Sequence, residues 1–264
     1  TITYEWIDAF ARRNMGIDTS QNLPTTDPII ANPKSFKNYY QLKINNDGKY
    51  VAYVANELSQ YRVYIKKVKG DEKAKRIAKW GPKIERLNDV TYPLLAWNPK
   101  GNALAMITEK KGVIYFSTYN LDEKETFTKP MTGIEKVIDF GYSPDGKKIV
   151  FSGVKKAKGQ ADIFVFTINA GGLEQITNDI WDDNHPRFVN KGNQILFSSN
   201  RQSDTIKDAD NARYDYKQSK FNDIFMYDLR KKSKVLLRVT NTPEINESYP
   251  VDYENGYFAY LSES

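Results

Sequence analysis

The chain has 264 residues, of which 40% are hydrophobic, 13% aromatic and 27% charged, with one histidine, no cysteine and a formal net charge of +6. The composition is that of a globular protein. The absence of cysteine excludes disulfide scaffolds, thiol nucleophiles and cysteine-ligated metals. No stretch of 18 residues is free of charge, and the N-terminus lacks the basic and apolar regions of a signal peptide. The sequence therefore predicts neither a membrane span nor a signal peptide in this segment.

The first 35 residues differ from the rest of the chain. Thr3 to Met15 reads as one amphipathic helix, with acidic residues early, basic residues late and Gly16 as a C-cap. Ile17 to Lys34 contains three prolines and reads as an extended linker. Because the chain opens without Met, we expect it to be a processed product or a segment of a longer protein.

The positive charge is concentrated between residues 36 and 89, where 13 basic and 6 acidic residues occur. The run from Lys66 to Lys73 mixes acids with lysines, which is typical of a solvated hairpin loop. A nucleic-acid-binding face usually concentrates basic residues along one element. The pattern favours the solvated loop, so no nucleic-acid partner is predicted.

Turn glycines recur along the rest of the chain at Gly48, Gly101, Gly146, Gly192 and Gly256. Each follows a turn signal such as Ser-Pro-Asp-Gly or Asn-Lys-Gly and precedes a strand rich in β-branched and aromatic residues. Proline presets the first turn position, and glycine accepts the positive φ that reverses the chain. Each glycine therefore marks the first hairpin of a repeated unit.

Further strands repeat almost letter for letter. Asp162–Phe166 resembles Asp223–Tyr227, and Ile176–Asn178 resembles Val239–Asn241; the extra length of the second copy lies in an insertion from Ser203 to Lys220. Four strands per unit at this period predict an all-β fold, a β-propeller of four-stranded antiparallel blades. Four blades and the start of a fifth are expected near 36–81, 90–130, 134–178, 182–241 and 246–264. Inner strands are expected near Leu94–Trp97, Val137–Phe140, Pro186–Val189 and Pro250–Tyr253.

The third and fourth units resemble the WD40-like repeat of TolB-like propellers. The residues that carry the resemblance are Tyr142–Gly146, Phe151–Ser152, Asp162–Val165, His185–Phe188, Phe197–Arg201 and Asp223–Asp228. It implies a larger cell-envelope protein of Bacteroidota type, located in the periplasm or at the outer membrane. It also implies a non-catalytic scaffold that binds a protein or peptide, such as an envelope lipoprotein or outer-membrane component.

The chain departs from that family's plan at both ends. Residues 1–35 are too short for the α/β domain that precedes the TolB propeller. Four blades and one hairpin would leave open sheet edges, which a propeller closes by joining its ends. We therefore expect the rest of the propeller chain to be missing from this segment.

Candidate catalytic residues are few. Gly141-Tyr142-Ser143-Pro144-Asp145 lacks the second glycine of a nucleophile elbow, so Ser143 is predicted to be a turn residue. The single histidine, His185, excludes a multi-histidine metal site. The alternative function is a propeller that gates substrate access to a prolyl oligopeptidase- or dipeptidyl peptidase-like hydrolase domain outside this segment. A Gly-x-Ser-x-Gly motif in such a domain would distinguish that alternative.

The insertion contains a sequence that resembles a calcium loop. Asp208–Asn211 could begin one, but Arg213 stands where glycine is needed and Ser219 where a bidentate glutamate is needed. No metal and no cofactor are predicted.

The connections between blades provide the candidate binding residues. Because these connections ring one end of a propeller channel, we expect six side chains to gather there: Tyr92, Trp181, Asp182, Asp183, His185 and Tyr249. Aromatic side chains with a few carboxylates are typical of an interface centre. The other interpretation is that these residues only pin the inner strands to their neighbours.

Overall fold

The computed structural model describes residues 28–30, 33–81, 91–156, 158–206, 220–253 and 256–263. The chain divides into two compact units, Thr1–Ser35 and Phe36–Ser264. The helix predicted for residues 3–15 and the calcium-loop candidates at 208–219 lie outside the described residues. Within the described ranges, no helix has the length and apolar character needed to cross a bilayer.

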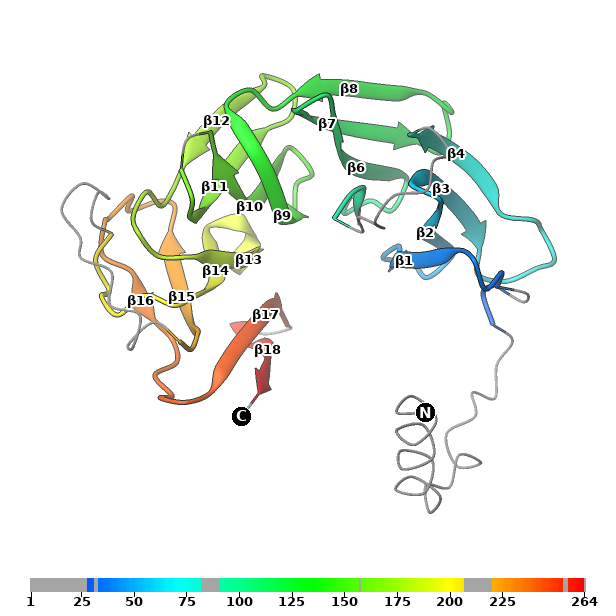
Figure 1. Cartoon of the computed structure of the whole chain (residues 1–264). Coiled ribbons are helices and arrows are strands. Elements are labelled where there is room, and N and C mark those ends of the chain that lie inside the picture. The colour runs from blue at the N-terminus through cyan, green and yellow to red at the C-terminus, as the bar shows by residue number, and fades with distance from the viewer. Residues whose placement is uncertain are drawn as a thin grey trace, which may run out of the picture. The chain divides into compact units, whose positions relative to one another are not determined.

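The second unit consists of four four-stranded antiparallel sheets and one two-stranded sheet, which follow one another along an arc in Figure 1. Each sheet is called a blade and numbered in chain order. Blade 1 contains β1 (Asn38–Ile44), β2 (Tyr50–Glu57), β3 (Gln60–Lys67) and β4 (Lys75–Trp80). Blade 2 contains β5 (Leu94–Trp97), β6 (Ala103–Lys110), β7 (Val113–Asn120) and β8 (Thr126–Pro130). Blade 3 contains β9 (Ile134–Tyr142), β10 (Lys148–Lys155), β11 (Ala161–Thr167) and β12 (Gly172–Gln175). Blade 4 contains β13 (Asp183–Val189), β14 (Gln194–Ser199), β15 (Asp223–Asp228) and β16 (Leu237–Arg238), and blade 5 contains β17 (Asn246–Asp252) and β18 (Phe258–Glu263).

This architecture confirms the predicted propeller of antiparallel blades. In every four-stranded blade the strands pair in chain order, and the first strand is the inner one. The predicted inner strand at Leu94–Trp97 coincides with β5, and the other three fall within or largely overlap β9, β13 and β17. The five turn glycines all have positive φ, between 70° and 85°. Glycine is favoured there because it has no Cβ to oppose a left-handed backbone.

The hydrophobic core lies between the blades. Separate clusters of buried side chains join blades 1 and 2, blades 2 and 3, blades 3 and 4, and blades 4 and 5. Between blades 2 and 3, the rings of Phe116 and Phe166 lie 5.9 Å apart. A buried side chain of this size contributes about 1.5–3 kcal/mol. Each blade therefore gains stability from its neighbours, and its inner strand is held at a fixed place beside the next.

Candidate functional site

Three inner strands each have a β-bulge, and in two of them a predicted rim residue lies at the bulge. Gln41 in β1, His185 in β13 and Tyr249 in β17 lie where the strand register shifts, and they have φ values of 53°, 52° and 52°. Such bulges redirect a side chain out of the regular alternation of the strand. The rings of His185 and Tyr249 contact each other, with centroids 3.7 Å apart. The repeat thus brings together two of the predicted rim residues that are 64 positions apart.

His185 is tied to its own blade. Its Nδ1 lies 3.1 Å from Oγ of Ser198, which donates a hydrogen bond to the carbonyl oxygen of Asn184. Burial lowers the pKa of His185; the charge of Asp139 opposes this shift and that of Arg187 adds to it. Ser198 is fully buried, so this Ser-His pair cannot present a nucleophile to a substrate. Its geometry orients the imidazole against Tyr249.

Tyr92 contacts blade 3. Its hydroxyl accepts a hydrogen bond from the backbone N of Val137 at 2.7 Å and donates one to the carbonyl oxygen of Val137 at 3.2 Å. Its own carbonyl oxygen accepts a hydrogen bond from the hydroxyl of Tyr40 at 2.7 Å. Tyr40 and Tyr92 therefore join the inner strands of blades 1, 2 and 3. This geometry favours the pinning role for Tyr92.

The segment Trp181–Asp183 connects blade 3 to blade 4. The backbone N of Trp181 donates to Asp179, and Oδ1 of Asp182 accepts from the backbone N of Ala161 at 3.0 Å. The backbone N of Asp182 in turn donates to Oδ1 of Asn200. Trp181 and Asp182 are half-buried, whereas Asp183 has an exposed fraction of 0%. A partner could reach the first two, but Asp183 is out of reach.

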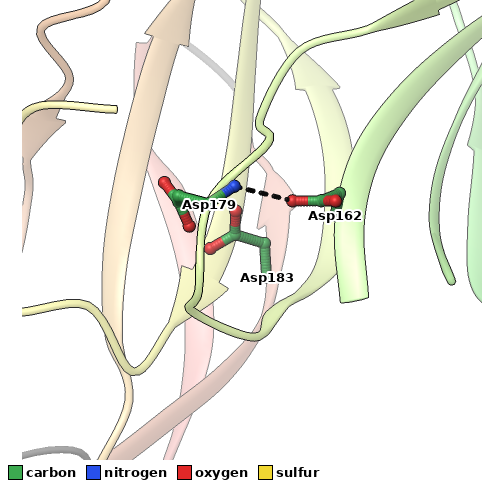
Figure 2. Close-up of side chains that lie close together, drawn as sticks. All are labelled: Asp162, Asp179 and Asp183. Atoms are coloured by element: carbon green, nitrogen blue, oxygen red, sulfur yellow. Dashed lines mark hydrogen bonds between the residues drawn. The ribbon is translucent and has the colours of Figure 1, made fainter. Parts of the chain in front are cut away.

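Asp183 belongs to a buried ionic cluster at the junction of blades 3 and 4 (Figure 2). Both of its oxygens accept hydrogen bonds from Nη2 of Arg201, at 2.7 and 2.6 Å. Nη1 of Arg201 donates to Asp179 at 3.0 Å, and Nε donates to Oγ of Ser199 at the same distance. The Arg201 side chain is 0% exposed. One guanidinium therefore links the end of blade 3 to the inner strand of blade 4.

Asp162, at the start of β11, completes this cluster from blade 3. Its oxygens accept hydrogen bonds from Nε2 of Gln175 at 3.0 Å and from the backbone N of Asp179 at 3.4 Å, the bond drawn in Figure 2. Burial and the nearby charge of Asp183 raise the pKa of Asp162 to about 8. Burial and Asp183 also raise the pKa of Asp179, against the opposing charge of Arg201. Asp162 is accordingly protonated at neutral pH.

The three carboxyl groups do not form a good metal site, although an oxygen from each lies within 4.8 Å of the others. A hard divalent cation needs several ionised oxygen ligands. Here Asp179 and Asp183 already direct oxygens at Arg201. A guanidinium already supplies the positive charge, so the chemistry of the cluster is that of a clamp between two blades.

A hollow of about 350 Å³ lies near the carboxyl ends of the inner strands. Side chains from β1, β5, β9, β13 and β17 line it, together with residues of the first turns of blades 1 and 2. Arg187 lines this hollow, and its Nη1 pairs with Asp139 of β9 at 2.6 Å. Gly141 makes room for this arginine, because a Cβ there would lie 3.2 Å from Cδ of Arg187. Of the predicted rim residues, Tyr92 and Trp181–Asp183 lie before or at the amino ends of inner strands, and His185 and Tyr249 lie at the bulges.

Sequence reasoning missed the residues of this hollow. Apolar Ile44 and Val251 lie in its wall although they are 60% and 44% exposed, and Lys43 and Asp252 bring opposite charges. Arg187 stands inside the repeat motif His185–Phe188. A charged side chain on an inner strand is the sequence feature from which this site could have been predicted.

Ser143 is a turn residue, as predicted. Its Oγ donates to Asp145 at 2.6 Å and accepts from the backbone N of Lys148 at 2.9 Å. The side chain therefore completes the first turn of blade 3, and none of these contacts prepares it as a nucleophile.

Solved structures with the same fold identify the architecture. No protein-family profile matches the sequence. Prolyl oligopeptidase B of Galerina marginata aligns with a TM-score of 0.57 at 12% identity, over 86% of this chain and 32% of that one. The β-propeller domain of the Trilobed protease from Pyrococcus furiosus aligns with a TM-score of 0.53 at 15% identity, over 86% of this chain and 64% of that one. A putative TolB from Agrobacterium tumefaciens aligns with a TM-score of 0.52 at 19% identity, over 76% of this chain and 64% of that one. The fold is a TolB-like β-propeller.

One curated relative resembles the propeller in sequence. Dipeptidyl-peptidase 5 of Porphyromonas gingivalis is 28% identical over 122 residues, which are 44% of this chain and 16% of that protein. The chain therefore matches only a small part of that relative's length. The propeller fold is shared with TolB and with propellers of several peptidases.

Proposed function

We propose that this propeller is a non-catalytic scaffold that binds a segment of a protein or peptide in the hollow at the carboxyl ends of its inner strands. The observation that carries the proposal is the composition of that hollow. All five inner strands contribute to one concave surface, with exposed apolar side chains beside charges of both signs. Apolar contact area with a few orienting charges is the chemistry of a polypeptide-binding site.

The charges of the hollow suit a polypeptide better than a simple anion. Arg187 is already paired with Asp139, so its charge is compensated, and Asp252 lines the same hollow as Lys43. An extended peptide can lay apolar side chains on Ile44 and Val251 while its backbone and polar groups meet the charged residues. The half-buried Trp181 and Asp182 and the His185–Tyr249 pair form a second contact region in this proposal.

The proposed location is the bacterial cell envelope, in the periplasm or at the outer membrane. The TolB likeness supports it, and the partner would then be an envelope lipoprotein or an outer-membrane component. The similarity to a Porphyromonas peptidase agrees with an origin in Bacteroidota.

The second candidate function is a propeller that gates substrate access to a serine peptidase domain. The sequence similarity to dipeptidyl-peptidase 5 and the structural likeness to prolyl oligopeptidase B favour it. The same hollow would then face the peptidase domain of its own chain.

Site-specific photo-crosslinking in native cells tests the proposal and separates the two functions. A photoreactive amino acid is placed at Lys43, at Asp252 or at Trp181, with exposed Lys231 on the outer side of blade 4 as the control position. The scaffold function predicts crosslinks to a second polypeptide from positions 43 and 252 and none from 231. Crosslinks within the same chain would favour the gating function. Equal labelling from position 231, or none from the hollow, would contradict both.

A further inference from the structure

A second concave surface lies at the edge of blades 1 and 2. One hollow of about 410 Å³ is lined by the first turn of blade 1 and the end of β3. A second of about 430 Å³ is lined by β3, β4 and the loop between them, together with the end of β7 and the β7–β8 turn. The two share Tyr50 and Lys67 in their walls. The two hollows therefore adjoin at these residues, and together they are called here the basic cleft.

The charge of the basic cleft is strongly positive. Its lining contains seven lysines and two carboxylates, a difference of five: Lys49, Lys66, Lys67, Lys69, Lys73, Lys75 and Lys124 against Asp47 and Glu72. Both carboxylates are engaged within the cleft, Asp47 with Lys49 at 3.1 Å and Glu72 with Lys67 at 2.7 Å. A concave surface lined by one sign of charge concentrates ligands of the opposite sign.

The floor of the cleft is apolar. Ile65 and Tyr119 are buried there, and Ile77 and Leu121 are half-buried beside them. Nζ of Lys75 donates to the hydroxyl of Tyr119 at 2.9 Å and lies 5.5 Å from its ring centre. The ring of Tyr119 is therefore covered and cannot stack on a nucleobase. An apolar floor between cationic walls fits a ligand that carries both carboxylates and an aliphatic side chain.

We propose that the basic cleft binds an acidic peptide segment, with carboxylates on the lysines and an apolar side chain on the floor between Ile77 and Leu121. The lining contains lysines and no arginine. Arginine is favoured where planar, bidentate recognition of phosphate matters, whereas lysines act as mobile point charges that suit carboxylates spaced along a peptide. This surface is separate from the hollow of the proposed function, so either site can exist without the other.

Fluorescence anisotropy with a labelled twelve-residue peptide that repeats Asp-Glu-Leu tests this inference. The folded chain is titrated at low and at physiological salt, and affinity is expected to fall at least several-fold as salt screens the contacts. The variant Lys69→Gln/Lys73→Gln/Lys124→Gln removes three exposed cleft charges and should bind at least tenfold more weakly. The matched control Lys156→Gln/Lys158→Gln/Lys231→Gln removes three exposed charges elsewhere and should stay within twofold of the wild type.

Three further ligands complete the test. A peptide with Asn and Gln in place of Asp and Glu should not bind, and one with Ser in place of Leu should bind more weakly. Single-stranded oligothymidylate of equal charge should bind more weakly than the acidic peptide. Equal losses in both triple variants, or tighter binding of the oligonucleotide, would overturn the proposal. An unchanged circular dichroism spectrum and melting temperature establish that each variant is folded.

Discussion

The junction between blades 3 and 4 and the junction between blades 4 and 5 are built from equivalent residues that make different contacts. Asp162 and Asp223 both lie in the first two residues of the third strand of their blades. Both accept a hydrogen bond from the backbone N of the residue that follows the Thr-Asn pair. The threonines are equivalent as well, because Thr177 and Thr240 each accept a hydrogen bond from the next residue of that third strand at 2.8 Å. The two junctions thus share these hydrogen bonds, and they differ in how the charged side chains pair.

The arginine that pairs with the carboxylates comes from a different strand position at each junction. At the first, Arg201 follows the second strand of blade 4 and is fully buried between Asp179 and Asp183. At the second, Arg238 on β16 pairs with Asp223, and its side chain is 23% exposed. Glu247 holds the position of Asp183; its Oε1 accepts a hydrogen bond from Thr242, and its Oε2 is buried with no hydrogen-bond partner among the described residues.

The comparison shows that the repeat fixes where polar groups are buried, but not how their charges are balanced. A buried charge that loses its partner is costly, whereas a pair near solvent contributes little. Equivalent positions in the two junctions should therefore respond very differently to substitution.

The largest effect is expected for Arg201→Met compared with Arg238→Met. Removing Arg201 leaves Asp179 and Asp183 buried beside each other without a cation, which should lower the free energy of unfolding by about 3–5 kcal/mol. Arg238→Met should lower it by about 1–2 kcal/mol, because Asp223 keeps two other donors and lies near solvent. Urea denaturation of both variants measures the difference. Equal losses would show that the buried cluster is no more demanding than the outer pair.

The next effect is a change in pH dependence on Asp162→Asn. The raised pKa of about 8 means that folded Asp162 keeps a proton that the unfolded chain releases near pH 4. The contribution of Asp162 to stability therefore falls as pH rises from about 4 to 8, because its carboxyl group holds fewer protons in the unfolded state than in the folded state over that range. Asparagine cannot ionise and can accept the same bond from Asp179. Between pH 5 and pH 8, the wild type should lose about 1–3 kcal/mol relative to the variant. Parallel stability curves would contradict the assignment of a protonated Asp162.

The smallest effect is expected for Glu247→Gln compared with Asp183→Asn. Glutamine can still accept the bond from Thr242, and its amide nitrogen would take the place of an oxygen that already has no partner, so stability should change by less than about 1 kcal/mol. Asp183→Asn weakens two bonds to Arg201 and should cost about 2 kcal/mol. Melting temperatures of the two variants measure this order. The reverse order would contradict the proposed difference between the two junctions.

The sequence was sufficient to predict the fold because turn chemistry is local. A glycine such as Gly146 needs only its own backbone angles and adjacent residues to define a hairpin, and its spacing from Gly192 then defines the next unit. The strand Leu94–Trp97 could be placed to the residue for the same reason.

The candidate sites could be predicted only in part, because they depend on register between blades. The bulge at His185 and the bulge at Tyr249 place their rings in contact, and the sequence had predicted that these two side chains gather. Asp183 was placed at the rim, yet its strand pairing with Ser199 directs it inward to Arg201. Lys43 and Asp252 meet in one hollow only because β1 and β17 both contribute to the channel wall.

The position of Arg201 also bears on how such a chain can be recombined. It belongs to the sheet of blade 4, but one of its two carboxylate partners, Asp179, lies in the segment that leaves blade 3. A segment exchanged between related genes with breakpoints at the sheet boundaries would carry the guanidinium without that acceptor. Breakpoints within the hairpin turns would instead transfer Asp162, Asp179 and Asp183 together and leave Arg201 to the recipient. The segment that can be inherited intact is therefore offset from the sheet, and it must extend from Asp162 to Arg201.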